Sequence, residues 1–161
     1  MKTEILGNIL GLTLAHSVFI GSGQDGVTLA PYVVYQQGEN RKVLNFEAET
    51  QQEAIDSAYA SIKEYQSSVD AWAISHEGLV TLDNGEKQDI HIVKAWINGL
   101  AEPIMIYQMF TPKPFKLIGN IKVLNFEDTG LDIDQAEILH QALDAGIDSH
   151  NSANEKWESW F

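Results

Sequence analysis

Apolar and β-branched residues fall into short runs that are separated by glycine, proline, asparagine and aspartate. Runs of this kind are typical of β-strands bounded by turns. They predict about eight strands, at residues 12–20, 27–36, 41–46, 69–75, 79–82, 89–97, 103–110 and 116–126. Residues 104–107 are apolar at consecutive positions, which predicts a central strand covered on both faces. The N-terminal stretch 2–11 fits either a short helix or an edge strand.

Two segments have the apolar period of an amphipathic helix. The first begins with the capping box at residues 50–53 and continues with apolar side chains at helical spacing. The second follows an acidic version of the same box at residues 132–135, and Gly146 is a plausible stop signal. We therefore expect an α+β fold, with an antiparallel, twisted sheet of about eight strands and two packed helices.

The hexapeptide Lys-Val-Leu-Asn-Phe-Glu occurs at residues 42–47 and again, half a chain later, at residues 122–127. In each half, three predicted strands precede a predicted helix, and the hexapeptide ends the third strand. We predict an internal βββα duplication with pseudo-repeat halves of about 1–80 and 81–161. A chain of 161 residues fits one domain, so residues 1–161 are expected to form a single domain.

Composition excludes several function classes. The chain has no cysteine, so it cannot form disulfides, Cys-ligated zinc sites, iron–sulfur clusters or a catalytic thiol. Its formal net charge of −13 opposes phosphate backbones and anionic lipid, so we expect neither nucleic acid nor membrane as a partner. Residues 5–15 are mostly apolar, but Glu4 offsets Lys2 and Asn8 interrupts the run. We therefore expect no signal peptide and a soluble, cytoplasmic protein.

The negative charge is concentrated towards the C-terminus. Residues 127–161 contain nine acids and one base, Lys156. Such a segment suits a basic protein partner, and it also suits the simpler role of keeping the protein in solution.

The second predicted helix carries Glu137, His140 and Asp144 along one flank. These three side chains could ligate a metal ion, or His140 could act as a base oriented by a carboxylate. The alternative is a half-buried, hydrogen-bonded histidine beside exposed acids. Because the first helix offers no histidine, the ligand set of a di-iron bundle is incomplete, and no metal or cofactor is predicted.

Other polar residues are weaker candidates. His16 and His91 fall on the first predicted strand of each half, and they would form a ligand-binding pair if they faced one cavity. The polar ends of the two hexapeptides could converge in the same way, or they could simply precede helix N-termini. Residues 21–26 spell G-x-G-x-x-G, but β-branched residues and Pro31 follow, which predicts a hairpin loop instead of a dinucleotide-binding turn.

The chain ends in three aromatic residues, Trp157, Trp160 and Phe161, which share one helical face. They are expected either to cover the body of the same chain or to anchor a partner or a second copy.

These patterns favour a non-enzymatic binding or interaction protein. It would be acidic, with a homodimer among its expected states, and would recognise a basic protein or a small ligand. The alternative is a small metal-dependent or acid/base enzyme that uses His140 with Glu137 and Asp144.

Overall fold

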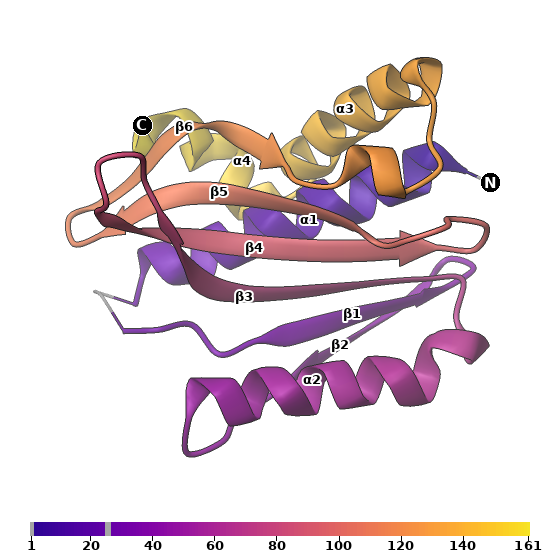
Figure 1. Ribbon diagram of the computed structural model, residues 1–161, viewed down its shortest axis with the longest axis horizontal. Helices are drawn as coiled ribbons and strands as arrows, with labels where there is room; N and C mark the ends of the chain where they lie inside the picture. Colours follow the sequence, from indigo (N-terminus) through magenta and orange to yellow (C-terminus); the bar gives the residue numbers. More distant parts are fainter. Residues whose placement is uncertain (1, 25–26) are drawn as a thin grey trace.

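The computed structural model describes residues 2–24 and 27–161, which form one six-stranded antiparallel sheet with helices on both faces (Figure 1). The elements, in chain order, are α1 (Thr3–Ser22), β1 (Tyr32–Gln37), β2 (Asn40–Asn45), α2 (Gln51–Tyr65), β3 (Ala71–Thr81), β4 (Lys87–Ile97), β5 (Ile104–Pro112), β6 (Phe115–Val123), α3 (Ile133–Asp148) and α4 (Asn151–Lys156). The strands lie in the order β2-β1-β3-β4-β5-β6, and every neighbouring pair is antiparallel. The predicted α+β fold is confirmed.

Two separate cores cover the two faces of the sheet. Along β3, alternate side chains point to opposite faces, so Ala71 and Ala73 belong to one core and Trp72 and Ile74 to the other. The larger core is formed with α1, α3 and the C-terminal segment, and the smaller one with α2.

The largest departure from expectation is α1, because residues 12–20 are helical and not a strand. The helix also includes the N-terminal stretch whose structure the sequence left open. Its mean hydropathy is 1.5, and most of its residues are buried between the sheet and α3. A helix buried on all sides is apolar all round, and such a run cannot be told from a strand by periodicity. By length and composition alone, α1 could also span a bilayer. In this structure, its packing inside the protein accounts for its apolar surface.

Glycines allow α1 and α3 to approach closely. A Cβ atom added at Gly11 would lie 2.0 Å from the backbone oxygen of Leu143, and one at Gly7 would lie 2.5 Å from Cβ of Ala142. On the facing helix, a Cβ at Gly146 would lie 2.5 Å from the backbone oxygen of Asn8. Any larger residue at these three positions would force the helices apart.

The number of elements differs from the prediction for identifiable reasons. The expected strands at 69–75 and 79–82 form one continuous strand, β3, and the expected strand at 12–20 is part of a helix. The described residues therefore form six strands instead of about eight. Gly78 does not make a turn; its missing side chain leaves room for Ile92, whose Cδ1 would lie 2.9 Å from an added Cβ. The predicted hairpin loop at 21–26 is wrong where it can be tested, because Gly21 and Ser22 end α1. Asp25 and Gly26 lie outside the described residues.

The structure does not confirm the βββα duplication. The two hexapeptides begin in β2 and β6, at opposite edges of the sheet, and a helix follows each one. In each hairpin the valine of the hexapeptide pairs with an apolar residue, Val43 with Val34 and Val123 with Ile106, but the two copies lie at different distances from their turns. However, α1 and β1 precede the first copy, whereas β3, β4 and β5 precede the second. The described residues also form four α-helices instead of two.

The glycine contacts predict a specific loss of stability. Gly11→Ala should lower the free energy of unfolding by about 3 kcal/mol, because the new methyl group would collide with the backbone of α3. Gly23→Ala is the matched control: it lies at the C-cap of the same helix with a φ of −96°, and an added Cβ would have its nearest neighbour at 3.7 Å. Urea denaturation of both variants checks this, and equal effects would contradict the packing described.

Candidate functional site

A groove of about 840 Å³ runs between the β5–β6 hairpin, α3 and the C-terminal turn η3 (Trp157–Trp160). Most of its lining is apolar. The sheet contributes Ile106, Ile121 and Val123, α3 contributes Leu139, Leu143 and Ile147, and the remaining apolar side chains are Phe126, Ala136, Trp157 and Phe161. The groove combines aliphatic walls with aromatic side chains at its C-terminal end.

An irregularity in the β5–β6 hairpin shapes the floor of the groove. The register shifts between Tyr107 and Met109, and Gly119 has a φ of +68°, a backbone conformation that side-chain-bearing residues rarely adopt. The Gln108 side chain holds this bulge in place, because its Nε2 donates to the backbone oxygens of Ile118 and Gly119, both at 3.0 Å. Gln108 is 1% exposed, and its Oε1 has no hydrogen-bond partner within residues 2–24 and 27–161. Gln108 lines the groove.

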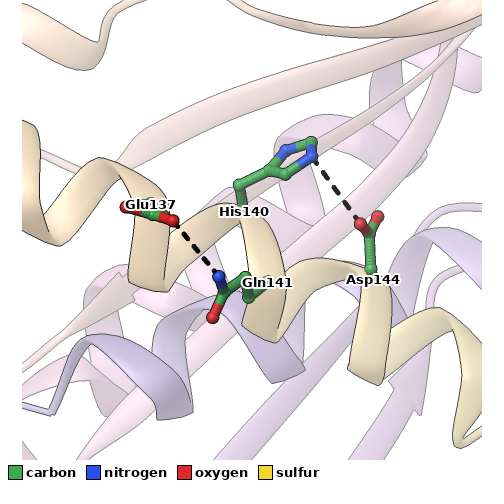
Figure 2. Close-up of polar contacts among 4 residues, drawn as sticks. All are labelled: Glu137, His140, Gln141 and Asp144. Carbon is green, nitrogen blue, oxygen red and sulfur yellow. Dashed lines mark hydrogen bonds and ion pairs between the residues drawn. The ribbon is translucent and has the colours of Figure 1, made fainter.

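Two of the three predicted residues on α3 lie at the rim of the groove. His140 and Asp144 are one turn apart, and Nε2 of the histidine lies 3.6 Å from a carboxylate oxygen of Asp144 (Figure 2). The side chains are 78% and 60% exposed, so His140 is more open to solvent than the half-buried alternative supposed. Glu137 does not join them: it accepts a hydrogen bond from Gln141 at 3.4 Å and does not line the groove.

The three candidate ligands Glu137, His140 and Asp144 do not assemble a metal site on this helix. Within the described part of the chain, no group of three or more histidine, aspartate or glutamate side chains is placed to hold a metal ion. His140 and Asp144 form a pair that lacks the third ligand, because Glu137 is directed to Gln141.

The C-terminal aromatic residues are divided between the core and the groove. Trp160 is 8% exposed and packs edge-to-face against Phe115 at a centroid distance of 5.9 Å. Trp157 is half-buried, Phe161 is 49% exposed, and both line the groove. Trp160 therefore docks the segment onto its own chain and leaves its two neighbours available at the site.

His16 and His91 do not form the predicted pair, because His16 lies on α1 and contacts His150 instead. His16 Nδ1 is 3.2 Å from His150 Nε2, and His150 Nδ1 accepts a hydrogen bond from the backbone N–H of Ala153 at 3.0 Å. We therefore assign the neutral His150 proton to Nε2, which donates to His16. Burial lowers the pKa of both histidines, and the neighbouring His150 lowers that of His16 further. His150 thus caps α4 and ties it to α1, a role that its sequence context did not suggest.

His91 lies on β4 and is fully buried beneath α1. Its ring stacks on Phe110 at 4.3 Å, its Nδ1 is 3.5 Å from the hydroxyl of Ser17, and that hydroxyl is 2.7 Å from the hydroxyl of Ser75. Burial lowers the pKa of His91 to about 3. A serine–histidine contact with no exposed surface cannot meet a substrate, so this cluster has a structural role.

The polar ends of the two hexapeptides do not converge, since β2 and β6 are the two edges of the sheet. Asn125 has a local role instead. Its Oδ1 accepts from the backbone N–H of Met105 at 2.9 Å, and its Nδ2 donates to the backbone oxygen of Pro103 at 2.8 Å. It thereby extends the β5–β6 pairing beyond the end of β6.

No protein-family model matches the chain, and comparisons with curated proteins and with solved structures found no match either. The function is therefore inferred from the geometry of the groove. Its polar residues His140 and Asp144 and its aromatic residues Trp157 and Phe161 were candidates from sequence, whereas Gln108 was not. The only sequence signal for Gln108 is a polar residue within the apolar strand β5.

The buried histidines predict that acid destabilises the fold. An unfolded histidine binds its proton near pH 6.5, whereas His91 resists protonation down to about pH 3. Its contribution is therefore complete above pH 6.5 and falls by about 1.4 kcal/mol for each pH unit below that value. His16 and His150, whose pKa values are also lowered, act in the same direction.

Urea denaturation between pH 7.5 and 5 measures this effect before most carboxylates titrate. His91→Leu should lower stability at pH 7.5 but make its pH dependence shallower. Phe110→Leu removes the stacking partner without removing a titratable group, so it should keep the wild-type pH dependence. A His91→Leu variant with the full wild-type slope would contradict the assignment.

Proposed function

We propose that this protein is a non-enzymatic binding protein that takes a small, largely apolar ligand in the groove between the β5–β6 hairpin and α3. The observation that carries this proposal is the groove itself. Its volume of about 840 Å³ lies within the roughly 300–1,000 Å³ range of small-molecule sites, and apolar side chains with a few polar ones line it.

The exposure of its apolar residues supports the proposal. Val123 is 47% exposed and Phe161 is 49% exposed, and both line the groove. Apolar surface removed from water contributes about 25 cal/mol per Å² to binding, before the cost of association. A ligand with an apolar body would cover these side chains, which the fold itself leaves in contact with water.

The polar residues at the rim support binding more than catalysis. The His140 side chain is 78% exposed, and its one ion-pair partner among the residues placed by the structure is Asp144, itself 60% exposed. Acid–base catalysis generally relies on a group whose environment excludes water and tunes its pKa. An open pair at the edge of an apolar groove is better suited to orienting a ligand than to transferring its proton.

The repeated hexapeptide provides a matched test. Val123→Glu places a carboxylate on the apolar floor and should weaken binding of the neutral dye Nile red at least tenfold, measured by fluorescence titration. Val43→Glu introduces the same change in the same local sequence at the opposite edge of the sheet. Val43 is 51% exposed and does not line the groove, so this variant should bind as the wild type does.

Equal dye affinities for the two variants would contradict the proposal, as would a wild-type protein that does not bind the dye. Native mass spectrometry of protein purified without chelator provides an independent readout. A retained small molecule should be present in the wild-type protein and depleted in Val123→Glu.

A further inference from the structure

The charged side chains of the groove have one sign. Asp144 and Glu158 are the acidic lining residues, and no lysine or arginine lies among the residues that line it. The nearest base in sequence, Lys156, is directed elsewhere, since its Nζ lies over the ring of Phe19 at 5.6 Å from the centroid. An anionic ligand in this groove would therefore meet two carboxylates and no compensating cation.

Aromatic faces accompany the carboxylates. Phe126, Trp157 and Phe161 line the groove, and the rings of Trp157 and Phe161 meet at an interplanar angle of 64° with a centroid distance of 6.4 Å. The face of an aromatic ring attracts a cation, and tryptophan does so most strongly. Aromatic rings beside carboxylates are a setting that stabilises organic ammonium groups.

Beneath the groove lies a buried acceptor that a donor on a ligand could satisfy after a local rearrangement. Gln108 lines the groove and is 1% exposed, and its Nε2 is fully used by three backbone oxygens of β5 and β6. Its carbonyl oxygen Oε1 has no partner among the residues whose placement is described. A buried carbonyl without a partner is unfavourable, and His91, the residue paired with Gln108 on β4, likewise has a buried Nε2 without a partner among the described residues. A donor on a ligand would reach Oε1 only if the side chains that cover it moved.

We infer that the ligand is an organic cation, with an apolar body and an ammonium or similar N–H-bearing group. This inference rests on the proposed function, because it specifies the ligand class of the same groove. The apolar body covers the walls formed by β6 and α3, and the positive group lies near Asp144, Glu158 and the aromatic rings. A cation also neutralises charge on a chain whose net charge is −13, whereas an anion would add to it.

The test uses three eight-carbon ligands with different polar groups: n-octylammonium, n-octanol and n-octanoate. Their affinities are measured at pH 7.5 by isothermal titration calorimetry, below the concentrations at which they aggregate. We expect n-octylammonium to bind at least tenfold more tightly than n-octanoate, with n-octanol between them. If n-octanol and n-octanoate bind as tightly as n-octylammonium, the groove binds apolar ligands but the charge preference is wrong. If none of the three binds, the proposed function itself fails.

Variants separate the groove from the overall charge of the protein. The double variant Asp144→Asn with Glu158→Gln should lose the tenfold preference for n-octylammonium while still binding n-octanol. Asp56→Asn with Glu64→Gln removes the same two charges from exposed positions on α2, across the sheet from the groove, and should retain the preference. If both double variants lose it equally, the preference belongs to the net charge and the inference is overturned. All four substitutions are nearly isosteric and exposed, so the fold should survive them.

Discussion

The rest of the structure depends on the close contact between α1 and α3. Gly7, Gly11 and Gly146 bring the two helix backbones to a separation at which even a methyl group would not fit. Because α3 packs mainly on α1 and makes few contacts with the strands, it is held above the sheet instead of lying on it. Helix α1 covers β3 and β4, and the β5–β6 side of the same face is left partly open. The groove is the space that this arrangement leaves.

The walls of the groove are fixed by interactions that lie outside it. Gln108 holds the β5–β6 bulge through hydrogen bonds to backbone oxygens, and Trp160 anchors the C-terminal turn on Phe115. His150 caps α4 and contacts His16, which ties the C-terminal segment to the central helix. Neither histidine lines the groove, yet both help to position the aromatic residues that do. A site held in this way is pre-formed, and a pre-formed site loses less conformational entropy when it binds a ligand.

The elements that the sequence predicted best were those bounded by clear turn or capping residues. The capped amphipathic helices α2 and α3 and the turn between β3 and β4 follow from periodicity and turn chemistry alone. Most residues of helix α1 are buried and the rest, apart from Glu4, are half-buried, so the helix has no polar face and it resembled a strand. His140, Asp144, Trp157 and Phe161 could be selected as candidates from residue type. Ile121, Val123 and Gln108 could not, because only the α1–α3 contact determines which strand residues α3 leaves uncovered.

The fold places part of the acidic C-terminal third beside the groove. The nine acids of residues 127–161 lie on α3, α4 and the turns that flank them, and two of them, Asp144 on α3 and Glu158 in the C-terminal turn, line the groove. From sequence, the same bias suggested only solubility or a basic protein partner. Two carboxylates beside a concave apolar surface produce a negative potential there, because the low dielectric of the walls concentrates the field. Even acids that do not touch a ligand therefore favour a cation over an anion at this site, and those at the rim determine where its charge lies.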